Sequence, residues 1–138
     1  QKLTPMNSPP VIRIKRIYES ASDDDGYRIL VDRLWPRGVS KQDARIDHWA
    51  KEVAPSTELR KWFDHDPGKF AAFVAKYRKL LDTSGAAQQL LADVDRPVIT
   101  LLYAARDAKY NHAAVLRDYL AALSTVYVPA EVYPPLPI

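Results

Sequence analysis

The chain has 138 residues, with 20 Lys and Arg, 17 Asp and Glu, and no cysteine. This length predicts one domain that can bury a core, and the lack of cysteine excludes disulfides, zinc–thiolate sites and thiol catalysis. A net charge of +3 is too small to indicate nucleic-acid binding by itself. No apolar run reaches transmembrane length and no signal peptide precedes the first strand, so we expect a cytoplasmic protein without membrane contact.

The two ends of the chain are rich in proline. Residues 1–10 hold three prolines, and Met6 resembles a natural start, so we expect this segment to be disordered or partly foreign to the native chain. We expect a single α/β domain over residues 11–123. Residues 124–138 form a Pro-rich tail that lies extended over the surface or reaches a partner, after a last short strand at residues 125–128.

Alternation of apolar and polar residues predicts a first strand over residues 11–18. An acidic turn with Gly26 at its tip follows, and residues 28–31 form a short, buried strand. The connection between these strands is short, which favours an antiparallel return over a parallel crossover.

The buried strand runs directly into Asp32-Arg33-Leu34-Trp35-Pro36-Arg37-Gly38. Pro36 cannot donate to a strand ladder and Gly38 frees the backbone, so the strand ends here. Buried charge is costly unless it is paired, and ligands of open α/β sheets bind just outside the carboxyl ends of strands. This stretch is therefore the first candidate for a functional site.

Helices are predicted between residues 40 and 91 from capping residues and apolar spacing. Ser40 caps a short helix in which Ile46, Trp49, Ala50 and Val53 lie at helical spacing. Ser56 caps a second helix, and Asp66 caps a third, which ends at Gly85. The clearest apolar stripe lies on this third helix: Phe70, Phe73, Val74, Tyr77, Leu80 and Leu81.

Residues 97–105 form a near-continuous apolar run, typical of a strand buried on both faces. Asn111 caps the helix after it. Because several helices separate this strand from residues 28–31, the two can be parallel neighbours. The sequence thus predicts an α/β fold: a small mixed, mainly parallel sheet with helices packed on it and a helical insertion between the two central strands.

Parallel pairing brings the segments that follow the two strands to one edge of the sheet. The ligand-binding candidates there are Arg33, Trp35, Arg37, Arg60, Tyr103, Arg106 and Asn111. Arginine forks suit a carboxylate or phosphate, although the same arginines can pair internally with Asp32 or Asp107. If there is catalysis, Asp32 or Asp107 is the candidate base, and a salt bridge to arginine would spoil that role.

Other site chemistries find no support. The four glycines are far apart, which excludes glycine-rich nucleotide loops, and His48, His65 and His112 lack metal-ligand spacing. We expect neither a metal nor another cofactor.

Five segments resemble the YeaO-like family of bacterial proteins of unknown function. They are residues 32–38 (DRLWPRG), 54–56, 59–63, 100–107 (TLLYAARD), and Asn111 with residues 115–120. The resemblance covers roughly residues 11–123, a span within the size of one domain. It implies a small α/β cytoplasmic protein but no established reaction. The wider family often has cysteines where this chain has Tyr103 and Asn111, and His112 matches a histidine of that pattern.

The leading hypothesis is a protein that binds a small anionic ligand at the strand ends, with hydrolysis or group transfer as the reaction if it is an enzyme. A nucleic-acid-binding module is a second, less favoured hypothesis, based on numerous basic residues and tryptophans that can stack on bases. A third is a non-catalytic interaction or scaffold protein, which includes self-association into a homodimer.

Overall fold

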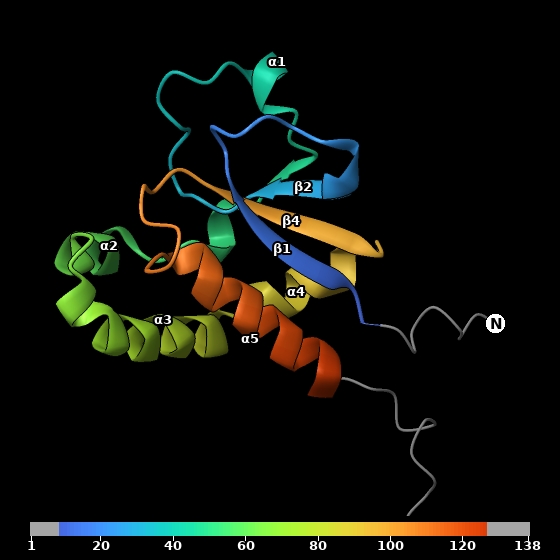
Figure 1. The fold of residues 1–138 in the computed structure, drawn as a ribbon. Helices are drawn as coiled ribbons and strands as arrows, with labels where there is room; N and C mark the ends of the chain where they lie inside the picture. The colour runs from blue at the N-terminus through green and yellow to red at the C-terminus, as the bar shows by residue number, and fades with distance from the viewer. Residues whose placement is uncertain (1–8, 127–138) are drawn as a thin grey trace, which may run out of the picture.

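A four-stranded parallel sheet forms the centre of the protein in a computed structural model that describes residues 9–126. The strands are β1 (Val11–Arg16), β2 (Tyr27–Leu30), β3 (His48–Trp49) and β4 (Val98–Tyr103). Their order is β1-β4-β2-β3, and each pair of neighbours is parallel (Figure 1). The α/β class and the helical insertion between the two central strands, β2 and β4, are therefore confirmed.

The predicted antiparallel return from the first strand is wrong. β1 and β2 do not pair with each other, because both pair in parallel with β4, which lies between them. The connection crosses over β4 with the short 3-10 helix η2 (Asp23–Asp25) in place of a full helix. Its end fits closely: Gly26 has φ +66°, and a Cβ atom there would lie 2.4 Å from the Val98 carbonyl oxygen.

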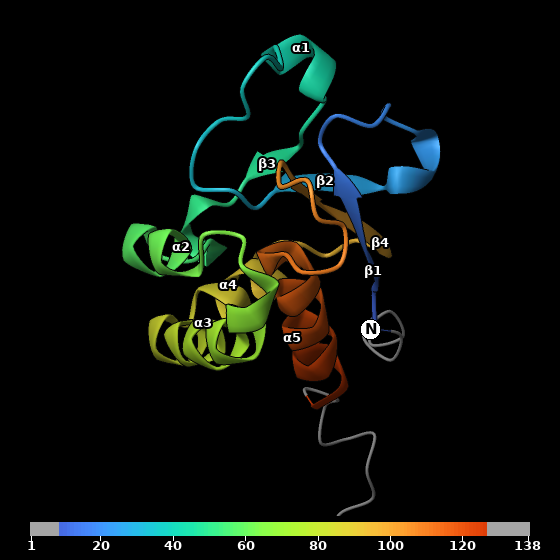
Figure 2. The ribbon, with the colours of Figure 1, turned by 60° about the vertical axis from the view of Figure 1, so that its left-hand side comes forward.

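Helices cover the two faces of the sheet unequally. The first is α1 (Lys41–Ala44), and the others are α2 (Thr57–Phe63), α3 (Phe70–Ser84), α4 (Ala86–Asp93) and α5 (His112–Val126). Two further 3-10 helices are η3 (Lys51–Val53) and η4 (Pro67–Lys69). Figures 1 and 2 show α3, α4 and α5 on one side of the sheet and α1 with its flanking loops on the other.

Two hydrophobic clusters correspond to these two faces. The larger joins the sheet to the helices and includes Leu101 of β4, Tyr77 of α3 and Leu116 of α5. The smaller has four buried residues, Ile17, Leu30, Ala44 and Leu102, with the half-buried Trp35 and Trp49 packed against them. Successive residues of β4 thus enter opposite cores, as its apolar run predicts.

Local capping signals agree with the structure. The Ser56 hydroxyl accepts from the Leu59 N–H at 3.1 Å, and the Asp66 carboxylate accepts from the Gly68 N–H at 2.9 Å. Gly85 ends α3 in the left-handed conformation, with φ +71°. Asn111 caps α5, since its Oδ1 accepts from the Ala114 N–H at 2.8 Å. The predictions for Ser56, Gly85 and Asn111 are confirmed, whereas Asp66 caps η4, the 3-10 turn that leads directly into α3, and not α3 itself.

The helix predicted across residues 46–53 is wrong. α1 ends at Ala44, and the chain then enters the short edge strand β3, where His48 pairs with Ile29 and Trp49 with Leu30. The apolar residues at helical spacing divide between the two cores, with Ile46 and Trp49 in the smaller one. These side chains are buried or half-buried where β3 and the segments before and after it pass along the sheet, and they do not share a helix face.

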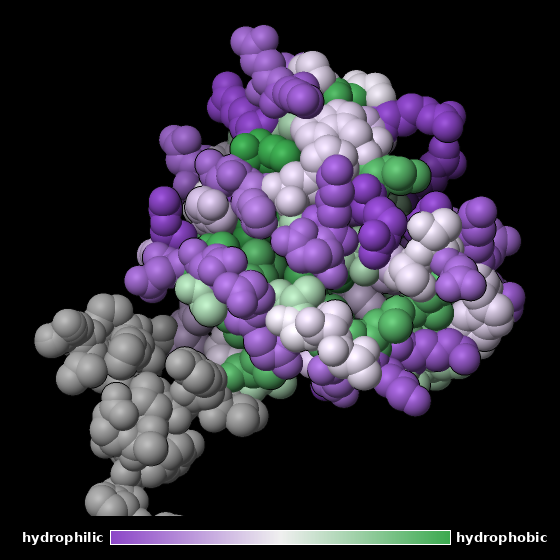
Figure 3. Space-filling view, turned by 180° about the vertical axis from the view of Figure 1, so that it is seen from behind, coloured by the Kyte–Doolittle hydropathy of each residue, from purple (hydrophilic) through white to green (hydrophobic). Residues whose placement is uncertain are grey.

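The predicted last strand at residues 125–128 is contradicted where the structure describes it, because Thr125 and Val126 belong to α5. The rest of that prediction, the Pro-rich tail and residues 1–8 lie outside the described residues. From behind, the surface shows apolar residues in separate groups between hydrophilic ones (Figure 3). Within residues 9–126, no helix has the length and apolar character to cross a membrane.

Candidate functional site

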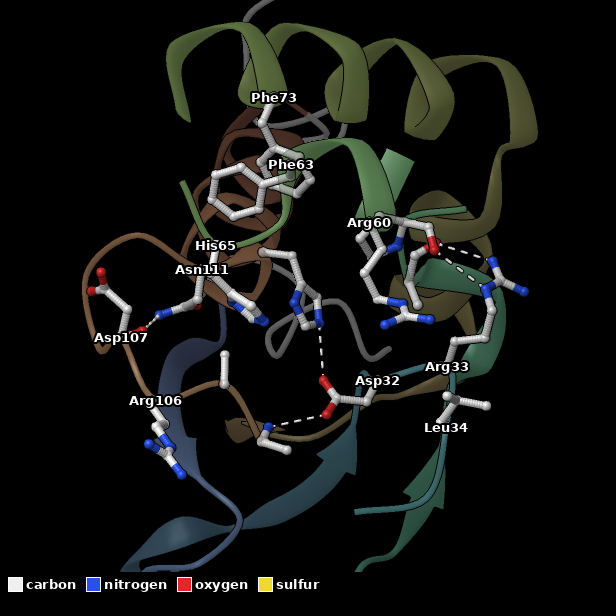
Figure 4. Close-up of a pocket in the computed structure, with 15 residues that line it drawn as sticks. Asp32, Arg33, Leu34, Arg60, Phe63, His65, Phe73, Arg106, Asp107 and Asn111 are labelled. Carbon is white, nitrogen blue, oxygen red and sulfur yellow. Dashed lines mark hydrogen bonds and ion pairs between the residues drawn. The ribbon is translucent and has the colours of Figure 1, made fainter. Parts of the chain in front are cut away.

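A cavity of about 560 Å³ opens where β2 and β4 end, below α2 and beside the first turn of α5 (Figure 4). Six of the predicted site residues line it: Asp32, Arg33, Arg60, Arg106, Asp107 and Asn111. The remaining lining residues are Leu34, Ala54, Pro55, Phe63, His65, Phe73, Ala104, Ala105 and His112. This position, at the carboxyl edge of a parallel sheet, is where ligands of α/β proteins bind.

Asp32 connects the ends of the two central strands. Its Oδ2 accepts from the Ala104 N–H at 3.0 Å, just after β4, and its main-chain oxygen accepts from the Trp49 indole N–H at 2.7 Å. Its Oδ1 lies 3.1 Å from His112 Nε2 (Figure 4). That contact meets the distance of an ion pair but not the geometry of a hydrogen bond, so Oδ1 is a buried oxygen without a hydrogen bond among the described residues.

His112, the first residue of α5, faces Asp32 across the cavity floor. Its Nε2 lies 3.1 Å from the Val31 carbonyl oxygen, and its side chain is only 15% exposed. The ring of Tyr77 packs edge-on against it, with 6.3 Å between the ring centroids. Sequence reasoning placed the neighbouring Asn111 in the site but not His112, whose contacts with Val31 and Asp32 only the folded chain shows.

The three arginines of the cavity have different partners. Arg33 donates to the main-chain oxygens of Ala54 and Pro55, at 3.3 and 3.2 Å, so its side chain ties the loop after β2 to the start of α2. The side chains of Arg60 and Arg106 have no hydrogen-bond or ion-pair partner within residues 9–126. In Figure 4 Arg60 reaches from α2 into the cavity, whereas Arg106 extends outward at its rim.

Asp107 and Asn111 hold the turn before α5. Asp107 Oδ1 accepts from the N–H groups of Lys109 and Tyr110, both at 2.9 Å, and these bonds hold the pKa of that carboxyl below its usual value. Asn111 is buried and donates to the Asp107 main-chain oxygen at 2.8 Å in addition to its capping bond. Both side chains therefore stabilise the turn before α5 at the wall of the cavity.

The structure places three predicted site residues away from the cavity. Trp35 donates from its indole N–H to the Val39 carbonyl and packs edge-on against Trp49 in the smaller core. Arg37 is exposed, and its main-chain oxygen accepts from the Tyr18 hydroxyl at 2.9 Å. Tyr103 is buried in the larger core, and burial raises the pKa of its hydroxyl. Of the predicted site residues, the structure therefore brings together the six that line the cavity.

Apolar groups form the opposite wall. Phe63 and Phe73 stack with 4.3 Å between their centroids, and both are buried at the top of the cavity in Figure 4. Leu34 is 63% exposed at the rim. Sequence reasoning assigned Phe73 to a helix stripe alone, and the spacing of that stripe carries no signal that the side chain also faces a cavity. The described residues contain no group of three or more side chains suited to hold a metal ion.

Fold and cavity together define a small α/β protein with a hollow at the carboxyl edge of a parallel sheet, lined by three arginines and by apolar side chains. The chain belongs to the family described as the inactive DUF488-N3 subclade, whose model matches residues 11–128. The predicted YeaO-like resemblance is thereby confirmed, and the family description assigns no reaction.

Relatives from two bacteria support this assignment. The chain is 47% identical over 113 residues to the uncharacterized protein YeaO of Escherichia coli K12, covering 81% of this chain and 98% of that protein. It is 44% identical over 109 residues to the uncharacterized protein Rv3073c of Mycobacterium tuberculosis H37Rv, covering 79% of this chain and 92% of that protein. No solved structure matches the chain.

Proposed function

We propose that the protein binds a small carboxylate- or phosphate-bearing molecule in the cavity and does not turn it over. The observation that carries the proposal is Arg60, whose guanidinium enters the cavity without a partner among the described residues. A planar guanidinium with free donors suits bidentate binding of a carboxylate or phosphate.

The charge of the lining supports an anionic ligand. Three arginines line the cavity against two aspartates. Both aspartates have other partners: Asp107 accepts two backbone N–H groups, and Asp32 faces His112 and the Ala104 N–H. The positive charge of Arg60 therefore remains available to a ligand, as does that of Arg106 at the rim.

Size and polarity limit the ligand further. A volume of about 560 Å³ is within the range of small-molecule sites, and the stacked Phe63 and Phe73 present an apolar wall. A ligand with a compact anionic group at Arg60 and an apolar portion against these rings would use both surfaces. Such a molecule has the size of a metabolite, not of a polymer.

The arrangement of acids favours binding over catalysis. The lowered pKa of Asp107 makes it a weak base, since its oxygen already accepts two backbone N–H groups. Asp32 is turned toward His112 and the backbone of Ala104. The description of the family as an inactive subclade agrees with a binding role.

Titration of the full chain with inorganic phosphate and with propionate, followed by NMR of backbone amides, tests the proposal. Loss of a charge-assisted hydrogen bond predicts that Arg60→Gln weakens binding about tenfold or more. Lys61→Gln is the matched control, because Lys61 is the next residue of α2, is exposed and does not line the cavity. Equal binding by Arg60→Gln and wild type, or amide shifts that map outside the cavity, would refute the proposal.

A further inference from the structure

The surroundings of His112 determine which of its ring nitrogens carries hydrogen. Nε2 lies 3.1 Å from the Val31 main-chain oxygen and 3.1 Å from Asp32 Oδ1. A main-chain carbonyl can only accept a hydrogen bond, and an ionised carboxylate can only accept as well. When the ring is neutral, Nε2 is therefore the nitrogen that carries hydrogen, and Nδ1 is left with a lone pair.

The lone pair of Nδ1 accepts no hydrogen bond and is accessible to solvent. No residue from 9 to 126 supplies it with a hydrogen bond. Within residues 9–126, Asp32 Oδ1 is the one buried side-chain nitrogen or oxygen that has no hydrogen-bond partner. Nδ1 of His112 also has no partner, so it cannot be a buried atom, and solvent can reach it. Since His112 lines the cavity, the structure offers an acceptor in the same cavity as the cation of Arg60.

Asp32 and Tyr77 hold the ring in this orientation. Asp32 is fixed by the Ala104 N–H, and its negative charge favours the side of the ring that bears hydrogen. Tyr77 is fully buried, donates its hydroxyl to the Val53 carbonyl and packs edge-on against the imidazole. Asp32 is thus a positioning residue, and His112 is the group that would touch a ligand.

We propose that His112 Nδ1 selects ligands that carry an O–H or N–H donor close to their anionic group. The ligand class is a hydroxy- or amino-substituted carboxylate, or a phosphate ester with a neighbouring hydroxyl. Arg60 takes the charge, and Nδ1 accepts the donor. This inference rests on the proposed function, because it specifies what the same cavity distinguishes among anions.

Lactate and propionate form a matched pair of probes, since lactate differs by one hydroxyl. We expect NMR titration of the full wild-type chain at about pH 8, where both acids are ionised, to show lactate binding about three- to tenfold more tightly. In His112→Gln the amide N–H can replace the Nε2 donor to Val31, but the amide oxygen is one bond further from Cγ than Nδ1 is, so no acceptor remains at the position of Nδ1. The lactate preference should then fall below about twofold. His48→Gln is the control, because His48 lies on β3 outside the cavity.

Three outcomes separate this inference from the proposed function. Equal binding of lactate and propionate by wild type overturns the inference and leaves the anion site standing. Failure of both acids to bind overturns the anion site and the inference with it. Independently, imidazole ¹⁵N shifts of the free wild-type chain should show hydrogen on Nε2 of His112, and hydrogen on Nδ1 would refute the inference even if His112→Gln does not fold.

Discussion

Replacement of Asp32 tests whether its carboxylate holds the carboxyl edge of the sheet together. Asp32→Ala removes the acceptor of the Ala104 N–H, a bond of 3.0 Å, and the partner of His112, while the Trp49 bond to the Asp32 main-chain oxygen remains. Leaving a partly buried donor without an acceptor costs about 1–3 kcal/mol. In a protein of this size that corresponds to a fall in Tm of roughly 4–12 °C.

Asp32→Asn should cost less. Its amide oxygen can still accept from the Ala104 N–H, but its NH₂ group would face the Nε2 hydrogen of His112, and two donors do not pair. We expect a loss of about 1 kcal/mol, smaller than that of Asp32→Ala. The two variants thus separate the acceptor role of the side chain from its charge.

Urea unfolding followed by tryptophan fluorescence, together with calorimetry, measures both variants. Asp95→Ala is the control, because Asp95 is exposed and has no partner among the described residues. We expect it to stay within about 0.5 kcal/mol of wild type. If Asp32→Ala is as stable as Asp95→Ala, the carboxylate does not join the strand ends, and the account of the cavity floor fails.

Three further predictions concern the frame around the site. Gly26→Ala should lower the free energy of unfolding in urea by about 2 kcal/mol or more, because the new Cβ would lie 2.4 Å from the Val98 carbonyl oxygen at a positive φ. An unchanged free energy of unfolding would contradict the geometry of the crossover from β1 to β2. Trp35→Phe should lose about 1 kcal/mol through the indole bond to Val39, with ligand affinity unchanged, and a selective loss of affinity would return Trp35 to the site. Burial would raise the pKa of Asp25, but the Ser22 N–H, Lys15 and Arg28 together lower that pKa by more. The ionised Asp25 therefore stabilises the folded protein fully above about pH 4, and this stabilisation is lost as the pH falls through the lower pKa of the folded state. Asp25→Asn should flatten this acid limb of a curve of unfolding free energy against pH.

Local signals in the sequence were sufficient for much of the fold. Ser56, Asp66, Gly85 and Asn111 mark helix ends through bonds to residues at most four positions away, so the immediate sequence determines them. β4 is also evident, because a strand buried on both faces is apolar throughout. Parallel pairing of β2 and β4 followed from the long helical insertion, and it located the cavity.

Longer-range features were not accessible in the same way. β3 has two residues, too few to show any periodicity, and its burial derives from pairing with Ile29 and Leu30. The parallel relation of β1 and β2 depends on a close approach of Gly26 to Val98, which no local pattern encodes.

Within the site, the misplaced and missed residues have separate causes. Tyr103 was placed at the edge because it ends a strand, yet alternation with Leu101 directs it into the larger core, a signal that the sequence did contain. Trp35 serves as an anchor for its own loop, through Val39 and Trp49. His112 was missed although the neighbouring Asn111 was predicted, because Asn111 has a local capping signal, whereas the contacts of His112 with Val31 and Asp32 have none.

The unequal cover of the two sheet faces has a consequence for how the molecule opens. The layer that carries α1 is thin, with four buried apolar residues, whereas the opposite layer holds most of the core. Amides between residues 33 and 47 should therefore exchange with deuterium through a partial opening, at a lower free energy than those of β4 and α5. Such an opening would detach the loop that borders the cavity while the main body stays folded, so bound ligand should slow exchange first in this segment.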